Sequence, residues 1–263
     1  MSDISGKVVI ITGSSSGIGQ ATAVLFAKSG ASVTIHGRSE DGIKKTKEMI
    51  LKAGISEDKI HFVQGSITDS KIQKAIIEET VKKFGKLDIL INNAGGINML
   101  EKNQRSMEAL DYILDLNLKA PIALTELAIP YLEKTKGCIL NVSSISSEKC
   151  QPNIPFYSVS KAGLDHFTRN YAAILAPMGI RINNLNPGLT DTPAVHQSEG
   201  SGEQIQKMKD FYLTQIPLKR AAESEEMAEF LLFMASEKAS YMTGQMIKVD
   251  GGLLIHSPTF KLD

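Results

Sequence analysis

The chain has 263 residues, of which 42% are hydrophobic and 22% are charged. This composition is typical of a globular protein, and it excludes a disordered chain, a collagen-like repeat and a long coiled coil. The 29 lysines and arginines balance the 29 aspartates and glutamates, so the formal net charge is zero. A neutral chain has no electrostatic attraction for nucleic acid or an anionic membrane, so we expect neither as a partner.

The only thiols are those of Cys138 and Cys150, which do not form a Cys-x-x-Cys pair. The five histidines are scattered without the spacing of metal ligands. We therefore expect neither a disulfide framework nor a metal site. The sequence has no run of eighteen apolar residues and no signal-like N-terminal stretch, so the expected location is the reduced cytoplasm.

Short apolar segments rich in β-branched residues alternate with longer segments of helical period. The predicted strands are residues 7–12, 32–36, 60–64, 87–92, 138–143, 181–186 and 245–249. The predicted helices are residues 17–29, 41–53, 69–84, 107–132, 157–176 and 223–235. Unbroken apolar strands such as Val8-Val9-Ile10-Ile11 are typical of a parallel sheet covered on both faces. The pattern predicts an α/β fold, a doubly wound Rossmann-type sheet of seven parallel strands, with residues 1–263 forming a single domain.

Two segments depart from this alternation. Pro121 interrupts the predicted helix 107–132, so we expect a kink or a restart there. Residues 188–217 contain Pro193, Gly200 and Gly202, and only the patch 203–213 has a helical period. A stretch of about 30 residues without a firm strand or a long helix is usually functional in a compact domain, so we expect a substrate lid.

The turn between the first strand and the first helix reads Thr12-Gly13-Ser14-Ser15-Ser16-Gly17-Ile18-Gly19. A glycine-rich turn that opens a helix directs backbone N–H groups and the positive end of the helix dipole at a phosphate. It therefore predicts dinucleotide binding, although incidental glycines in a tight turn remain an alternative. Gln20 and Ala21 stand where a P-loop needs lysine and then serine or threonine, which argues against an ATPase. The nucleophile elbow of α/β hydrolases also fits Gly13-x-Ser15-x-Gly17, but that elbow follows several strands rather than one.

The end of the second strand indicates which dinucleotide is bound. An NAD-binding fold carries an acid about 20 residues beyond the glycines, where it binds the ribose 2′-hydroxyl. Here the sequence is Ile35-His36-Gly37-Arg38-Ser39, without a carboxylate. A guanidinium matches a 2′-phosphate better than a hydroxyl, so the expected cofactor is NADP(H), with Arg38 on its phosphate. An ordinary solvated arginine remains the alternative.

Tyr157 and Lys161 are four residues apart in a predicted helix, so they lie on one face. A lysine ammonium about 4 Å from the phenol, at an effective dielectric constant near 20, would favour the phenolate by about 4 kcal/mol and bring its pKa from about 10 to about 7. Such a phenol can exchange protons at neutral pH. The spacing alone is weak evidence, but Ser143 and Ser144 add hydroxyls at the edge of the sheet where ligands bind.

Taken together, these features resemble a known family. The motifs, in order, are Thr12-Gly13-x-x-x-Gly17-x-Gly19, Asn92-Asn93-Ala94-Gly95, Asn117, Ser144, Tyr157-x-x-x-Lys161 and Asn186-Pro187-Gly188. From about residue 7 to residue 252, the chain resembles the short-chain dehydrogenase/reductases. The resemblance implies hydride transfer between a nicotinamide and a carbonyl compound or secondary alcohol.

The resemblance also implies four catalytic residues. Tyr157 would exchange a proton with the substrate oxygen, and Ser144 would hydrogen-bond that oxygen. Lys161 would bind the nicotinamide ribose and lower the pKa of the phenol, and Asn117 would hold a water in a proton relay.

The remaining site residues follow from the same resemblance. The expected cofactor contacts are Gly13, Ser15, Ser16, Gly17, Ile18, Gly19, Arg38, Ser66, Ile67, Asn93, Ala94, Gly95, Tyr157, Lys161, Pro187, Gly188, Thr190 and Thr192. The expected substrate contacts are Ser144, Ile145, Cys150, Tyr157 and Gly188. Ser66 departs from the family pattern, since many relatives carry an aspartate there that binds the adenine amino group.

We therefore expect an NADP(H)-dependent carbonyl reductase that acts on a small carbonyl or alcohol compound. The resemblance implies assembly as a homotetramer or homodimer. One alternative is an NAD-dependent sugar or steroid alcohol dehydrogenase. Another is a non-catalytic dinucleotide-binding sensor, against which the presence of both Tyr157 and Lys161 argues.

Overall fold

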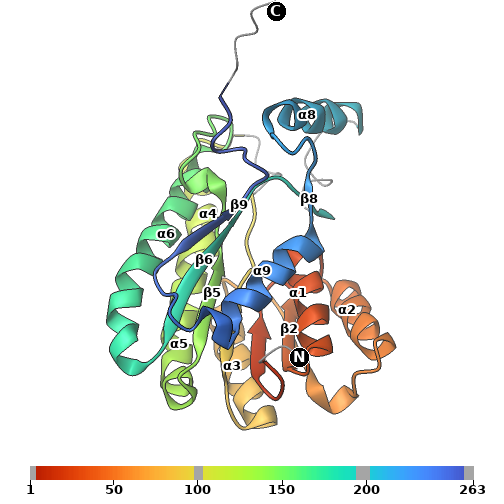
Figure 1. Cartoon of the computed structure of the whole chain (residues 1–263), viewed down its shortest axis with the longest axis vertical. Coiled ribbons are helices and arrows are strands. Elements are labelled where there is room, and N and C mark those ends of the chain that lie inside the picture. The colour runs from red at the N-terminus through yellow and green to blue at the C-terminus, as the bar shows by residue number, and fades with distance from the viewer. Residues whose placement is uncertain (1–3, 98–102, 194–201, 258–263) are drawn as a thin grey trace, which may run out of the picture.

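The computed structural model of the protein describes residues 4–97, 103–193 and 202–257 and shows a central sheet between two layers of helices (Figure 1). All neighbouring strands of this sheet are parallel, and their order is β3-β2-β1-β4-β5-β6-β9. The strands are β1 (Val8–Ile11), β2 (Ser32–Gly37), β3 (Ile60–Gln64), β4 (Ile89–Asn92), β5 (Cys138–Val142), β6 (Arg181–Pro187) and β9 (Met246–Val249). The predicted seven-stranded Rossmann-type sheet is confirmed. The order reverses between β1 and β4, where ligands bind in folds of this type.

Helices cover both faces of the sheet, as the apolar strands require. The helices α1 (Gly17–Lys28), α2 (Glu40–Lys52) and α9 (Ser224–Ala235) pack on one face, and α3 (Ser70–Phe84), α5 (Ala120–Thr135) and α6 (Pro155–Leu175) pack on the other. Successive residues of β1 therefore enter different cores. Val9 and Ile11 pack in the core that contains Phe26, whereas Ile10 packs in the core that contains Leu124.

Local signals set the boundaries of several helices. The side chain of Ser39 accepts a hydrogen bond from Gly42 at the start of α2, and Asp69 accepts one from Lys71 at the start of α3. Gly85 ends α3 in the left-handed conformation, with φ of 81°. Within the described residues, short 3₁₀ turns occur at η1 (Glu57–Lys59), η3 (Ile145–Ser147), η4 (Ala176–Met178) and η5 (Glu237–Ala239).

The predicted helix 107–132 is wrong as one element. The chain forms α4 (Met107–Leu114), then a π-helical turn, η2 (Asp115–Lys119), and then α5, with Pro121 in its first turn. The restart at Pro121 is therefore as expected, but the irregular turn precedes the proline. The turn contains Asn117, which is 1% exposed and exchanges two hydrogen bonds with the backbone of Gly96. A π turn inside a helix is frequently found at a functional site.

The predicted lid, residues 188–217, has more regular structure than expected. It contains the short strand β7 (Thr190–Asp191), which pairs with β8 (Ala222–Glu223), and the helix α8 (Gly202–Gln215). Residues 194–201 of the lid lie outside the described residues. Lys209 of α8 forms an ion pair with Asp191 at 3.1 Å, and the hydroxyl of Tyr212 donates to Gln151 at 3.1 Å. These contacts connect α8 to β7 and to the loop that follows β5.

No helix within the described ranges has the length and apolar character needed to cross a bilayer. In the same part of the chain, His, Cys, Asp and Glu form no group of three or more that could hold a metal ion.

The buried sheet generates a stability prediction. We expect Leu90→Ala to lower the free energy of unfolding by about 2–5 kcal/mol, because Leu90 on β4 is fully buried and its truncation leaves a cavity. The matched control is Leu51→Ala on α2, where the side chain is 38% exposed, and its cost should stay below about 1 kcal/mol. Chemical denaturation measures both changes, and similar losses for the two variants would contradict the assignment of Leu90 to the core.

Candidate active site

The candidate site lies where the carboxyl ends of the parallel strands meet. Lys161 on α6 donates a hydrogen bond from Nζ to the carbonyl of Val142, the last residue of β5, at 2.8 Å. Ser144 follows two residues later, and the glycine turn follows β1, two strands away in the sheet. The topology thus brings the glycine turn, Ser144 and the Tyr157–Lys161 helical turn to one edge.

The glycine turn is held in shape by the segment that follows β4. The hydroxyl of Thr12 accepts hydrogen bonds from the N–H groups of Asn93 and Ala94, both at 3.0 Å. The amide of Asn93 donates to the carbonyls of Thr12 at 2.9 Å and Gly13 at 3.1 Å. A methyl group on Gly19 would overlap the Asn93 amide nitrogen and the Gly13 carbonyl oxygen, so glycine is required there. The side chain of Asn93 therefore holds the backbone of the glycine turn in place through hydrogen bonds to its carbonyls.

The start of α1 has the donors that a phosphate needs. Its N-cap residue, Ser16, makes no side-chain capping bond, and the first turn contains no acidic residue, whereas Ser39 and Asp69 cap α2 and α3. The first N–H groups of an α-helix have no partner within the helix, and they carry the positive end of its dipole. The residues at Ser16–Gly19 therefore fit the pyrophosphate of a dinucleotide.

The ends of β2 and β3 lie beside each other next to this turn. Arg38 is exposed immediately after β2, and its carbonyl accepts a hydrogen bond from the amide of Gln64 at 3.2 Å. Ser66, beyond β3, is also exposed. Ser15 packs closely under β2, since a Cβ on Gly37 would lie 2.7 Å from the side chain of Ser15. Ile67 is 4% exposed, and its side chain packs in the apolar core, so only its main chain is available to a ligand.

Ser144, Tyr157 and Lys161 form one cluster. Ser144 lies close enough to Tyr157 to affect the pKa of its phenol, and Lys161 Nζ lies 5.7 Å from the centre of the Tyr157 ring. The Ser144 hydroxyl also lies 3.1 Å from that of Ser146. Ser144 and Lys161 are buried, whereas Tyr157 is partly exposed.

The electrostatics of the cluster differ from the sequence-based expectation. Burial raises the pKa of Tyr157 above its ordinary value, and the nearby Ser144 side chain opposes this shift only in part. Burial lowers the pKa of Lys161 to about 8, against the opposing charge of Asp165. The expectation that Lys161 brings the pKa of the phenol near 7 assumed a separation of about 4 Å. In the structure Nζ donates to the Val142 carbonyl and lies 5.7 Å from the centre of the Tyr157 ring, and burial sets the direction of the pKa shift of Tyr157.

Asn117 reaches this cluster from the π turn. Its Oδ1 accepts from the N–H of Gly96 at 2.9 Å, and its Nδ2 donates to the Gly96 carbonyl at 2.8 Å. A Cβ on Gly95 would lie 2.7 Å from Asn117 Oδ1 and 3.4 Å from Lys161 Nζ. The backbone at Gly95 therefore passes between the side chains of Asn117 and Lys161 and contacts both, which leaves no room for a larger residue there.

The segment after β6 also reaches the candidate site. Gly188 donates to the carbonyl of Val249 at 2.9 Å, and a Cβ on it would lie 2.7 Å from the backbone of Asp250. The hydroxyl of Thr190 donates back to the Gly188 carbonyl at 3.3 Å. Thr192 reaches the glycine turn, where its side chain lies 3.3 Å from the position of a Cβ on Gly17. The chain from Pro187 to Thr192 thus runs from the end of the sheet to the start of α1.

The residues expected to contact substrate lie in different environments. Ile145 is 3% exposed and packs with Ile216 and Leu253 in a small apolar cluster that Leu189 and Tyr212 join. Cys150 is an exposed free thiol. Ile145 therefore packs toward α8 from the loop between β5 and α6 (residues 143–154, the catalytic loop), whereas Cys150 lies at the surface of that loop.

A buried polar network behind the site was not predicted from the sequence. Asp165, one helical turn beyond Lys161, is 2% exposed, and its carboxylate accepts hydrogen bonds from Asn184 and Asn186, both at 2.8 Å. The amide of Asn186 also donates to the carbonyl of Ser144 at 3.2 Å. The network therefore connects α6, β6 and the catalytic loop. The four-residue spacing from Lys161 was the one signal that could have identified Asp165.

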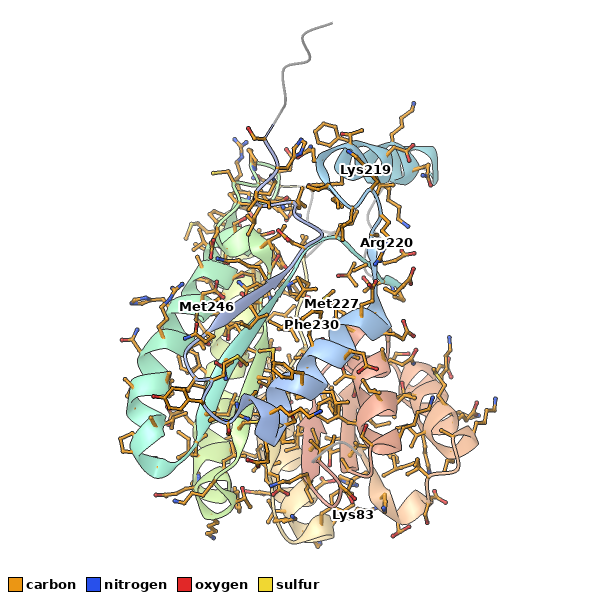
Figure 2. The ribbon with its side chains drawn as sticks, in the orientation of Figure 1. Lys83, Lys219, Arg220, Met227, Phe230 and Met246 are labelled. Carbon is orange, nitrogen blue, oxygen red and sulfur yellow. The ribbon has the colours of Figure 1, made fainter. Side chains whose placement is uncertain are left out.

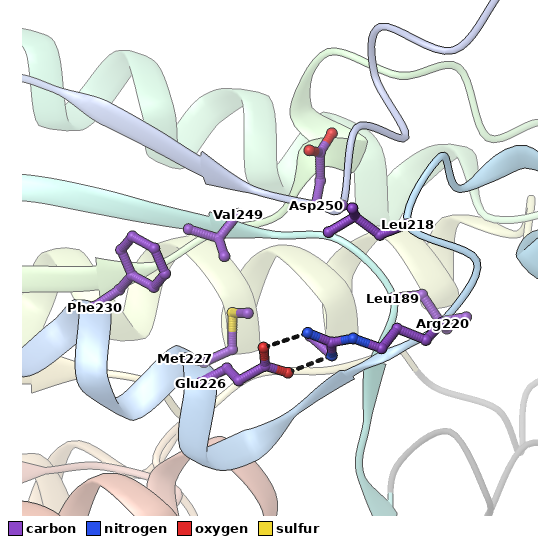
Figure 3. A pocket seen from close by; sticks show the side chains of 10 residues that line it. Leu189, Leu218, Arg220, Glu226, Met227, Phe230, Val249 and Asp250 are labelled. Carbon is purple, nitrogen blue, oxygen red and sulfur yellow. Dashed lines mark hydrogen bonds and ion pairs between the residues drawn. The ribbon is translucent and has the colours of Figure 1, made fainter.

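A separate hollow lies between α9 and β9. Figure 2 places Met227 and Phe230 along α9, and places Arg220 in the segment that leads from α8 to β8. Figure 3 shows the hollow, with Arg220 and Glu226 joined by two bonds of 2.6 and 2.7 Å. Its lining residues are Leu189, Leu218, Arg220, Ala222, Glu226, Met227, Phe230, Val249, Asp250 and Gly251. These residues include neither Ser144 nor Tyr157, so the hollow is distinct from the candidate site.

Comparison with known proteins agrees with this geometry. A family described as "Enoyl-(Acyl carrier protein) reductase" matches residues 13–254. The chain belongs to the short-chain dehydrogenase/reductase family. It is 36% identical to the 3-oxoacyl-[acyl-carrier-protein] reductase of Thermotoga maritima, over 96% of this chain and 99% of that one.

Two solved structures of the family are close in fold. One is a short-chain dehydrogenase/reductase of unknown function from Caenorhabditis elegans with cofactor, with a TM-score of 0.92 and 39% identity over 97% of both chains. The other is a 7α-hydroxysteroid dehydrogenase in complex with NADH and 7-oxo glycochenodeoxycholic acid, with a TM-score of 0.87 and 31% identity over 95% of this chain and 94% of that one. This short-chain dehydrogenase/reductase is thus an oxidoreductase that acts on an alcohol or carbonyl group with a nicotinamide dinucleotide.

The buried network generates a second prediction. We expect Asn186→Ala to lower the free energy of unfolding by about 1–3 kcal/mol, because it removes one of the two amide donors to the buried Asp165 carboxylate. The matched control is Asn170→Ala, since Asn170 is exposed and donates only to the carbonyl of His166, and it should cost less than about 0.5 kcal/mol. Urea denaturation at constant pH compares the two, and equal costs would show that the network adds no stability.

Proposed function

We propose that the protein is an NADP(H)-dependent carbonyl reductase that also runs as a secondary-alcohol dehydrogenase. The observation that supports this most directly is the cluster of Ser144, Tyr157 and Lys161 beside the glycine turn. The cluster brings together the phenol of Tyr157 as an acid, the hydroxyl of Ser144 as a hydrogen-bond donor and the buried ammonium of Lys161 at one edge of the sheet. This set can protonate an oxygen and stabilise the negative charge that develops on it.

Each member of the cluster has one task in this proposal. The nicotinamide supplies or accepts the hydride. Tyr157 donates its phenolic proton to the carbonyl oxygen during reduction and takes it back during oxidation. The Ser144 hydroxyl donates a hydrogen bond to the same oxygen. Lys161 stabilises the phenolate that reduction leaves behind and binds the hydroxyls of the nicotinamide ribose.

Asn117 has a supporting task. Both ends of its amide are bonded to Gly96, so the π turn keeps its side chain in one orientation beside Gly95 and Lys161. In the proposal, Asn117 binds a water molecule that connects the Lys161 ammonium with solvent. Through this water and Lys161, solvent replaces the proton that Tyr157 loses. The pKa of about 8 for Lys161 allows this lysine to pass a proton near neutral pH.

The cofactor is assigned along the crevice from its adenosine end to its nicotinamide end. Arg38 binds the 2′-phosphate, and Ser66 and the main chain of Ile67 lie along the adenine. Ser15, Ser16 and Ile18 bind the pyrophosphate with Gly13, Gly17 and Gly19, and Asn93, Ala94 and Gly95 line the adenosine side. Pro187, Gly188, Thr190 and Thr192 flank the nicotinamide.

NAD(H) is the second candidate, and a specific observation favours it. The 7α-hydroxysteroid dehydrogenase, similar in fold, was solved with NADH. Against this, the end of β2 in this chain has no carboxylate for a 2′-hydroxyl, and it presents the exposed guanidinium of Arg38 instead. The electrostatics therefore support NADP(H) over NAD(H).

The substrate is assigned to the space between the catalytic loop and α8. The apolar cluster around Ile145, with Leu189, Tyr212 and Ile216, favours a small or medium-sized compound with an apolar part beside its carbonyl group. Gly188 and Cys150 border this space in the proposal. The described residues of the predicted lid, 188–193 and 202–217, border it in the proposal.

Assembly into a homotetramer or homodimer is also part of the proposal. Large apolar side chains are exposed on α4 and α6, namely Tyr112 at 37%, Val159 at 55% and Ile174 at 53%. A second copy of the chain would cover such side chains. The zero net charge favours neither nucleic acid nor a membrane as a partner.

Removal of the phenolic hydroxyl tests the catalytic assignment. We expect Tyr157→Phe to lower kcat for ketone reduction by a factor of about 10²–10⁴, the usual contribution of a positioned acid. Binding of NADPH, followed by its fluorescence, should change little, because the ring remains. A panel of ketones, diketones, quinones and steroids with the native enzyme identifies the assay substrate. A Tyr157→Phe variant with near-native turnover would exclude Tyr157 as the proton donor.

Charge reversal at the end of β2 tests the cofactor assignment. We expect Arg38→Asp to weaken binding of NADPH about 100-fold, because it replaces the phosphate-binding cation with an anion. The dissociation constant for NADH should change less than about threefold or improve, since an acid there can bind the 2′-hydroxyl. Arg105→Asp, an arginine outside the site, is the control for net charge. An equal loss for the two dinucleotides would refute the role of Arg38.

A further inference from the structure

His36 stands out among the buried polar side chains because both of its ring nitrogens are bonded to backbone of the nucleotide crevice. It lies on β2 and is 2% exposed. Its Nδ1 lies 3.3 Å from the N–H of Gly13 in the glycine turn. Its Nε2 lies 3.2 Å from the carbonyl of Gly65, directly before Ser66 and Ile67. The imidazole ring therefore spans two segments that are distant in sequence.

The partners determine the state of the ring. The N–H of Gly13 can only donate, so Nδ1 must be an acceptor without a proton. The carbonyl of Gly65 can only accept, so Nε2 must carry the proton. Burial lowers the pKa of His36 to about 4, although the Gly65 carbonyl opposes this shift. The imidazole is therefore neutral in one tautomer at physiological pH.

The backbone of His36 adds two contacts to the same turn. Its N–H donates to the Ser14 hydroxyl at 2.9 Å, and its carbonyl accepts from the N–H of Ser14 at 2.8 Å. The Ser14 hydroxyl in turn donates to the carbonyl of Ile11 at 2.8 Å. The start of the glycine turn is thus attached to β2 by both the main chain and the imidazole of one residue.

We propose that His36 is a positioning residue for the dinucleotide, because it fixes the distance between the phosphate-binding turn at Gly13 and the adenine-side segment at Gly65. The two segments bind opposite parts of the adenosine diphosphate moiety, so the ligand needs them at a set separation. The inference rests on the proposed binding of the cofactor along this crevice. It assigns no catalytic step to His36, which acts through Gly13 and Gly65.

Three substitutions separate the two contacts of the ring. Asparagine carries an acceptor, Oδ1, at the same distance from the backbone as Nδ1, so His36→Asn retains a partner for Gly13 but loses the contact to Gly65. Glutamine carries a donor at the distance of Nε2, so His36→Gln retains the contact to Gly65 but leaves the buried N–H of Gly13 unpaired. His36→Leu loses both contacts. The control is His61→Leu on β3, where the side chain pairs with Glu79 instead of the crevice.

The readout is the dissociation constant of NADPH and of NADH, from fluorescence titration at neutral pH without substrate. We expect His36→Leu to weaken both about tenfold or more, with His36→Asn and His36→Gln between it and the native protein. His61→Leu should match the native protein. At saturating cofactor, kcat should remain within about twofold, whereas KM for the cofactor should rise. Partial rescue by Asn and Gln would not follow from a general loss of folding, which thermal melting of each variant reports separately.

The outcomes are decisive for this inference. Folded His36→Leu protein that binds both dinucleotides like the native chain would overturn it, as would a loss of kcat at saturating cofactor with unchanged affinity. A native protein that binds neither dinucleotide would instead overturn the proposed function. The two failures are therefore distinguishable in one set of titrations.

Discussion

The buried ammonium group of Lys161 is the constraint around which the rest of the site is arranged. It is only 4% exposed, and burial alone would remove its charge, so it needs polar neighbours at short range. The Val142 carbonyl accepts from it at the end of β5, and Asp165 raises its pKa from the next turn of α6. Gly95 lets the chain after β4 pass close by. The end of β5, the helix α6 and the segment after β4 are therefore all positioned around the Lys161 ammonium.

Much of the fold follows from the sequence because its signals are local. Unbroken apolar runs such as Val8–Ile11 predicted buried parallel strands, and their number and orientation were confirmed. The break at Asp115–Lys119 was not predicted, because it depends on the contact between Asn117 and Gly96, 21 residues earlier. The pairing of β7 with β8 likewise joins segments about 30 residues apart, and two-residue strands leave no periodic pattern.

The candidate site shows the same division between local and long-range information. Motif spacing placed Tyr157 and Lys161 on one helical face and Ser144 beside them, and the structure brings these side chains together. The direction of the pKa shift of Tyr157 was wrong, since it depends on desolvation and on where the ammonium points. The partners of His36 depend on the register of β2 against its neighbours, and those of Asp165 depend on how α6 packs against β6; spacing along the chain encodes neither.

The two halves of the site are also stabilised differently. On the cofactor side, the turns are held by side chains that hydrogen-bond directly to backbone, from Asn93 to Thr12, from His36 to Gly13 and from Asn117 to Gly96. On the substrate side, α8 is held by apolar contacts around Ile216 and by a few side-chain pairs. Directional bonds to backbone fix a position closely, whereas apolar packing tolerates exchange of one side chain for another of similar volume. In the proposed binding mode, the dinucleotide therefore lies against backbone that directional bonds hold in position, and the substrate lies against side chains held by apolar packing.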